Sequence, residues 1–220
     1  MPARLHTGGR YRRWLGEHLA GDPELGDRLW RRLMHCAGAL VLVYFLLPVG
    51  FFRVVSNEVV LFAALAVVLS LEGLRHVAHL EIPTVLPRER DKVASFAFYA
   101  IALVATVVLF DRPVATFAVI GAAFLDPVIG EMRRSARWRP AYPALPLAAY
   151  GAIAFAALLF VGRFSAPGAI VLAVPAAVVA ILAEGPRMGR LDDDLAMTIA
   201  PALFAAAMLF LFPGLPNWSP

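Results

Sequence analysis

Long runs of apolar residues, separated by short polar segments, divide the chain. These runs cover residues 33–52, 59–71, 93–110, 114–125, 144–161, 166–183 and 195–212. Most of them approach the roughly 20 residues that a helix needs to cross the hydrocarbon core of a bilayer. Because backbone polar groups in lipid must be satisfied within a helix or a closed barrel, the pattern predicts an all-α, polytopic membrane protein with about seven transmembrane helices.

The composition excludes an ordinary soluble domain. Of the 220 residues, 60% are hydrophobic and 16% are charged, and the mean hydropathy is +0.73. Soluble domains are nearer half apolar and a quarter charged. The single cysteine, Cys36, excludes a disulfide framework and a cysteine-rich zinc module. The net charge of +4 is informative through the way that the charges are divided between the two sides of a bilayer. No nucleic-acid partner is expected.

The positions of the basic residues predict the orientation. Seventeen of the 20 Lys and Arg lie before the first run or in the loops on the same side, and the exceptions are Arg53, Arg112 and Arg163. The positive-inside rule then predicts an integral cell-membrane protein with its N-terminus in the cytoplasm and its C-terminus outside. Residues 1–31 lack the apolar core of a signal peptide and are expected to form a partly amphipathic cytoplasmic arm. Residues 32–213 form the membrane domain, and residues 214–220 form a short external tail.

Two runs are too short unless their helices continue through an acidic residue. Runs 59–71 and 114–125 end at Glu72 and Asp126, so both helices are expected to extend further. At about 1.5 Å per residue, Asp126 lies about 7 Å deeper than Glu131. An acid at that depth is costly and is therefore a candidate functional residue. Pro127 and Gly130 follow, which predicts a local break in the helix and room for a ligand against Gly130.

Three aspartates precede the last run. Asp194 is in the place of a helix N-cap, which needs only one of the three. Adjacent carboxylates are unfavourable without a cation, and carboxylates facing phosphate oxygens are a usual way to hold Mg²⁺. Asp126 with Asp192 or Asp193 is therefore the candidate Mg²⁺ site, and a solvated acidic turn is the alternative.

Cationic side chains stand at helix ends on the same side. Arg32 lies three residues before His35 at the start of the first helix, and Lys92 lies three residues before Ser95 at the start of the third. On the second helix Glu72 is expected to orient Arg75 through i,i+3 pairing and to leave Arg75 available to an anionic ligand. Snorkelling toward water is the alternative interpretation for any one of these cations.

The predicted topology makes these groups neighbours. The starts of helices one, three and seven and the ends of helices two, four and six all reach the cytoplasmic side. Cations for phosphate oxygens and carboxylates for Mg²⁺ above an apolar interior are typical of a place where a nucleotide meets a lipid. His35 is the candidate proton acceptor, with Asp126 and Lys92 as further catalytic candidates. The candidate phosphate-binding residues are Arg32, Arg75, Lys92, Ser95, Gly130, Arg133 and Arg134.

Four segments, in order, resemble motifs of the family of dolichol kinases, phytol kinases and CTP-dependent diacylglycerol kinases. They are Arg31 to Gly38 (R-[RK]-x-x-H-x-x-G), residues 89–95 (the third-helix start), Leu125 to Gly130 (G-D-[PA]-x-x-G) and Asp192 to Asp194 with Pro201 (D-D-N-x-x-x-P). The resemblance implies phosphorylation of a long-chain isoprenoid alcohol at the cytoplasmic membrane face, with CTP as the phosphoryl donor. It also implies a more distant similarity to phosphatidate cytidylyltransferases.

Three function classes therefore stay open. A CTP-dependent lipid kinase, with Mg²⁺ as cofactor and with a membrane lipid and a nucleoside triphosphate as partners, is the leading hypothesis. A cytidylyltransferase that makes a CDP-activated lipid is the second, and a non-catalytic lipid-binding membrane protein is the third. The sequence does not fix the oligomeric state, for which a homodimer is one option.

Overall fold

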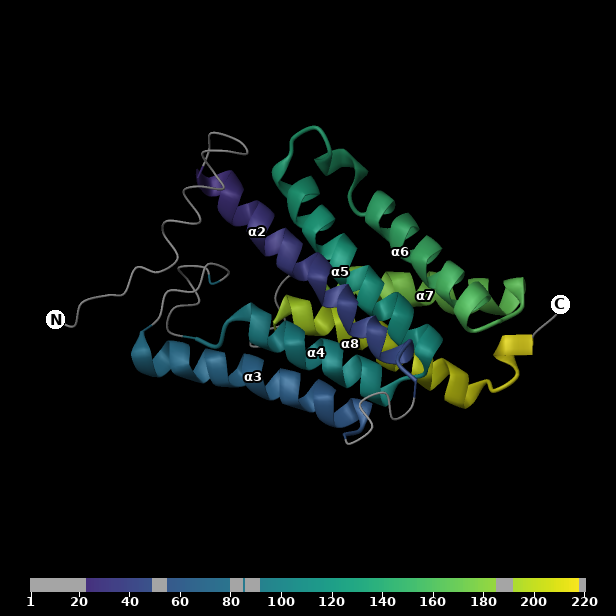
Figure 1. Cartoon of the computed structure of the whole chain (residues 1–220). Coiled ribbons are helices and arrows are strands. Elements are labelled where there is room, and N and C mark those ends of the chain that lie inside the picture. Colours follow the sequence, from purple (N-terminus) through teal and green to yellow (C-terminus); the bar gives the residue numbers. More distant parts are fainter. Residues whose placement is uncertain (1–22, 49–54, 80–84, 86–91, 185–191, 218–220) are drawn as a thin grey trace.

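A computed structural model describes residues 23–48, 55–79, 85, 92–184 and 192–217. In these residues the chain is all-α, as predicted, and contains seven α-helices with short 3-10 and π segments (Figure 1). The elements are α2 (Pro23–Gly38), η1 (Ala39–Phe45), α3 (Asn57–Ala78), α4 (Ser95–Leu109), α5 (Arg112–Arg134), η3 (Arg139–Ala141), α6 (Ala144–Ala156), η4 (Ala157–Val161), α7 (Ala166–Ala183), α8 (Asp193–Leu211) and η5 (Leu215–Asn217). The predicted arm up to residue 22, the loop with Arg53, the motif at 89–91 and the end of the tail lie outside the described residues.

Five of the described helices are long and apolar enough to cross a membrane. They are α3, α5, α6 with η4, α7 and α8. The chain is therefore an integral membrane protein by the length and composition of its helices, although seven spans were predicted. The third run forms only the 15-residue α4. The first run begins within α2, which starts ten residues earlier at Pro23 and carries charged residues in its first half.

Helices α5 and α8 lie at the centre of the bundle. Helices α6 and α7 pack on one side of them, while α2 and α4 pack on the other (Figure 1). Helix α3 lies outermost and packs against α4, with only 6% of its apolar window buried. Its exposed apolar side chains are suited to contact with lipid, because apolar groups facing hydrocarbon require no protein partner.

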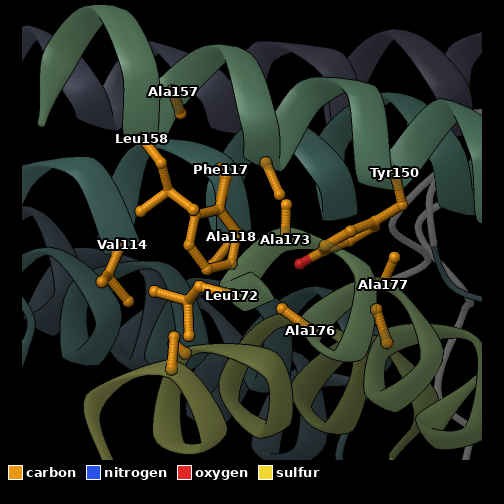
Figure 2. Close-up of a cluster of buried hydrophobic side chains, with 14 of the residues drawn as sticks. Val114, Phe117, Ala118, Tyr150, Ala157, Leu158, Leu172, Ala173, Ala176 and Ala177 are labelled. Carbon is orange, nitrogen blue, oxygen red and sulfur yellow. The ribbon is translucent and has the colours of Figure 1, made fainter. Parts of the chain in front are cut away.

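Small residues allow the central helices to approach closely. Phe117, Tyr150 and Leu172 fill the core against alanines from α5 and α7 (Figure 2). A Cβ on Gly121 would lie 2.3 Å from the Tyr150 ring, so only glycine fits where α5 meets α6. Close approach through small residues is the usual way that helices associate in membranes, where hydrophobic burial supplies little driving force.

The beginning of α8 differs from the prediction by two residues. Asp192, and not Asp194, is the N-cap, and its carboxylate accepts a hydrogen bond from the Asp194 backbone N–H at 3.1 Å. The predicted cap at Asp194 is therefore wrong. Since the helix starts at Asp193, Asp194 lies in its first turn and turns inward, where it is 3% exposed.

Helix α5 continues without a break through Pro127, so the predicted break is wrong. Proline lacks an N–H and leaves the carbonyl four residues earlier, that of Ala123, without its usual helical donor. The Cys36 thiol of α2 donates to this carbonyl at 3.6 Å. This weak bond gives the freed oxygen a partner from the neighbouring helix, and α5 keeps Asp126 at a fixed depth.

Candidate functional site

Three ionisable side chains from three helices meet at one end of the bundle. The Nε2 atom of His35, in the last turn of α2, lies 3.1 Å from Asp194 Oδ1 and 3.4 Å from Asp126 Oδ2. His35 and Asp194 are buried, whereas Asp126 is partly exposed. We call His35, Asp126 and Asp194 the carboxylate–histidine cluster. The structure thus brings together residues that the sequence placed at separate helix ends.

Contacts with α4 fix the orientation of His35. The Tyr99 ring stacks on the imidazole, with ring centroids 4.5 Å apart and 10° between the planes. The Tyr99 hydroxyl donates to the His35 backbone carbonyl at 3.0 Å. A Cβ on Gly38 would lie 2.6 Å from Tyr99, so glycine is required at this position to let α2 approach α4. The imidazole is therefore held in place before any ligand binds.

One oxygen of the carboxylate–histidine cluster lacks a hydrogen bond. Asp194 Oδ2 is buried and has no hydrogen-bond partner among the described residues, and the guanidinium of Arg31 lies 3.8 Å from it. A buried, unpaired carboxylate oxygen is costly, so this atom is suited to a cation ligand. Ligand atoms of His35, Asp126 and Asp194 lie within 4.8 Å of one another, as do those of Asp192, Asp193 and Asp194. Both groups have the size of a metal site.

Asp192 extends the cluster toward α4. Its Oδ2 accepts a hydrogen bond from Ser95 Oγ at 2.8 Å. Burial and the nearby Asp194 charge raise the pKa of the Asp192 carboxyl to about 6, although the Ser95 hydrogen bond lowers it. Asp193 is exposed, so of the two aspartates predicted as alternative ligands Asp192 faces the protein.

The predicted i,i+3 pairing of Glu72 and Arg75 is confirmed. The Arg75 guanidinium donates to both Glu72 oxygens, at 2.8 Å and 2.7 Å, and to the Lys92 carbonyl at 2.5 Å. Glu72 also accepts from the Ala94 N–H at 2.8 Å. Because Glu72 and Arg75 are both buried, this pair ties the end of α3 to the start of α4, and the guanidinium is committed to protein partners. The Lys92 side chain is exposed.

Two further ion pairs surround the cluster. Arg32 of α2 pairs with Glu131 of α5. Arg133 Nη2 donates to Glu184 Oε2 at 2.6 Å and to the Tyr142 hydroxyl at 2.6 Å, and its guanidinium lies 4.7 Å from the centre of the Tyr142 ring. These contacts join the ends of α2, α5 and α7.

Sequence reasoning did not single out Glu184 or Tyr142. Burial raises the pKa of the Glu184 carboxyl to about 7, with Arg133 lowering it and Asp126 raising it. Glu184 directly follows an apolar run, as Asp126 does, and this position was the available signal. The long separation between Arg133 and Glu184 in the sequence concealed their pairing.

The remaining predicted phosphate-binding residues are accessible. Arg134 is exposed at the end of α5. A Cβ on Gly130 would meet no atom within 4 Å, so there is open space beside this residue. No neighbouring group among the described residues lies close enough to require glycine at this position.

The site therefore combines three carboxylates, a fixed imidazole and guanidinium groups beside an apolar bundle. Carboxylates with guanidinium groups suit a metal-bound polyphosphate, and the apolar helices suit a lipid. Comparison with known proteins adds nothing to this geometry. No protein-family model, no curated protein and no solved structure matches this chain.

Proposed function

We propose that this chain is a lipid kinase that transfers the γ-phosphoryl group of CTP to a long-chain isoprenoid alcohol at the cytoplasmic face of the membrane. The observation that carries the proposal is the carboxylate–histidine cluster, which lies at one end of a bundle of apolar helices with His35 and Asp194 buried. Phosphoryl transfer needs positioning and charge neutralisation more than covalent chemistry from the protein, and this cluster supplies groups for both. The motif resemblance supports CTP as donor and an isoprenoid alcohol as acceptor.

Asp194 and Asp192 are the residues that would hold Mg²⁺. Asp194 Oδ2, which accepts no hydrogen bond from the described residues, and the neighbouring Asp192 carboxylate fit a hard cation that prefers oxygen ligands. When bound, the ion would neutralise charge on the β- and γ-phosphates. This assignment replaces the pairing of Asp126 with Asp192 or Asp193 that the sequence favoured, because Asp194 is the inward-facing member of the three aspartates.

Asp126 is the proposed proton acceptor. The Nε2 atom of His35 faces two carboxylates, so in this arrangement that nitrogen carries a hydrogen and donates it. His35 therefore positions Asp126 and Asp194, in place of the base role that the sequence suggested. As the alcohol oxygen bonds to the γ-phosphorus, the bond from phosphorus to the β–γ bridging oxygen breaks and CDP leaves. The hydroxyl proton passes to Asp126 and then to water.

The cations near the cluster are proposed to bind phosphate oxygens. Arg31 lies closest to Asp194, and Arg32 and Arg133 are held nearby by Glu131 and Glu184. A guanidinium that already shares one carboxylate keeps further N–H donors for a second anion. Lys92 and Arg134 are exposed and can reach phosphates without breaking a buried contact.

Product analysis tests the proposal. The full chain, purified in nanodiscs, is incubated with Mg²⁺ and with CTP labelled at either the α- or the γ-phosphate, together with a polyprenol, diacylglycerol or phosphatidate. A kinase transfers the γ-label to the alcohol and releases α-labelled CDP. Transfer of the α-label to phosphatidate with release of pyrophosphate would instead establish a cytidylyltransferase. Failure to label any of these lipids, while the protein is folded, would overturn both assignments.

A further inference from the structure

A cavity of about 200 Å³ opens beside the carboxylate–histidine cluster, between α2, α3 and α4. Its walls are mainly apolar and include Val68 of α3 and Phe96 and Ala100 of α4. Its polar end is formed by Arg31, His35 and Ser95. The cavity therefore joins an apolar passage to the groups that the proposed reaction uses.

The location of the cavity gives it access to lipid. Helix α3, which forms one wall, is almost fully exposed on its other faces and suits the hydrocarbon of the bilayer. Val68 and Ala100 are both partly exposed, so each borders the cavity while remaining accessible. An apolar chain can reach His35 along this route without crossing water.

The polar end favours a neutral oxygen over an anionic headgroup. His35 and Ser95 each hydrogen-bond to a carboxylate, Asp194 and Asp192 respectively. A lipid phosphate or carboxylate at this end would approach both acids, and Arg31 is the one permanently cationic side chain among the described residues that line the cavity. A hydroxyl carries no charge and can donate to a carboxylate.

We infer that this cavity takes the hydroxyl-bearing end of a lipid alcohol and admits a single apolar chain. The inference rests on the proposed function and deepens it, because it excludes two-chain glycerolipids as acceptors. Pockets that enclose drug-sized ligands have volumes of about 300–1,000 Å³, so this cavity holds only the first part of one chain. The rest of the chain lies in the bilayer, and selection occurs near the hydroxyl. Val68 and Ala100 set the width of the passage.

Photo-crosslinking tests the inference without requiring turnover. The probe is a single-chain isoprenoid alcohol with a diazirine near its hydroxyl, added to the full chain in nanodiscs, and the labelled peptides are mapped by mass spectrometry. Labelling is expected on α3 and α4 around Val68 and Ala100. Ala100→Phe and Val68→Phe fill the cavity from two different helices, and each should reduce this labelling by at least about tenfold. Ala152→Phe on the exposed face of α6 is the matched control and should leave it unchanged.

The outcomes separate this inference from the proposed function. Cavity labelling that the filling variants abolish supports the lipid-alcohol site even if no phosphate is transferred, in which case only the kinase proposal fails. Phosphate transfer with labelling elsewhere, or labelling that both folded variants leave intact, overturns the cavity assignment while the kinase proposal stands. A diacylglycerol probe that labels the cavity as strongly as the single-chain alcohol overturns the selection for one chain. Unfolding midpoints identify a variant that fails to fold, and the variant on the other helix then decides the result.

Discussion

The His35 Nε2 atom lies 3.1 Å from Asp194 Oδ1, although 159 positions separate the two residues. The contact joins the last turn of α2 to the first turn of α8. The carboxylate of Asp126, on α5, also contacts this imidazole nitrogen, so one ring links three helices. Any change to this ring or its carboxylates should therefore affect both the chemistry and the packing of the site.

Asp194→Asn should abolish most of the proposed phosphate transfer. It removes the buried charge of Asp194, whose Oδ2 accepts no hydrogen bond in the part of the chain that the structure describes. We expect turnover to fall by at least about a hundredfold, as for loss of a group that stabilises transition-state charge. The measure is initial rate against Mg²⁺ concentration, together with the Mg²⁺-dependent rise in the unfolding midpoint. Asp111→Asn, an exposed aspartate before α5, is the control. Full turnover and an unchanged response to Mg²⁺ in Asp194→Asn would show that the metal assignment is wrong.

Gly38→Ala should destabilise the protein and displace His35. The new Cβ would lie 2.6 Å from the Tyr99 ring, which stacks on the imidazole. Overpacking of this kind costs about 1–3 kcal/mol. Gly73→Ala is the matched control, because its Cβ meets nothing within 4 Å and alanine favours a helix by about 0.5–1 kcal/mol. Thermal unfolding in nanodiscs measures both variants, and equal midpoints would contradict the prediction.

Glu72→Gln should be far more harmful than Glu131→Gln. Both acids pair with an arginine, but the Glu72–Arg75 pair is buried, whereas Glu131 is exposed and Arg32 is partly exposed. Loss of one partner of a buried pair costs about 3–5 kcal/mol, because the other charge stays buried alone. An exposed pair contributes about 1 kcal/mol or less. Denaturant unfolding compares the two variants, and similar losses would refute a structural role for the Glu72–Arg75 pair.

Glu184→Gln should change how stability depends on pH. Burial raises the pKa of the folded Glu184 carboxyl from its ordinary 4.5 to about 7, although Arg133 opposes the shift. The folded state therefore binds the extra proton more tightly than the unfolded chain. The resulting stabilisation is full below about pH 4.5 and is lost as the pH rises through about 7.

Glutamine remains neutral throughout this range. The unfolding midpoint of Glu184→Gln relative to the wild type should therefore increase between pH 4.5 and pH 8. Midpoints recorded at several pH values test this expectation. A difference that stays constant over the range would show that Glu184 does not titrate there.

Much of the helical framework could be predicted because apolar length alone determines it. The run 166–183 coincides with α7, and α3 continues through Glu72 as the length of its run required. The gathering of charged groups at one end also followed from the alternating direction of successive helices. These features depend on local composition, which a single sequence contains, and on the thickness of a bilayer, which is known independently of the sequence.

The site itself was less predictable because it depends on helix register. Moving the N-cap from Asp194 to Asp192 decides which carboxylate turns inward, since successive residues on a helix point about 100° apart. The sequence could not show that Arg133 finds Glu184, because that contact depends on how α5 and α7 pack. Nor could it show that a thiol on α2 would donate a hydrogen bond to the carbonyl that Pro127 leaves without a helical donor.

Helix α5 sets the distance between Asp126 and the two ends of the helix. At about 1.5 Å per residue, Asp126 lies about 12 Å along the helix axis from Arg134 and about 21 Å from Arg112. Because α5 is one helix on both sides of Pro127, these two distances are set by the rise of a single helix. In the proposed reaction the water-soluble donor must therefore reach down past the rim of the protein, while the lipid needs only to slide sideways within its own leaflet.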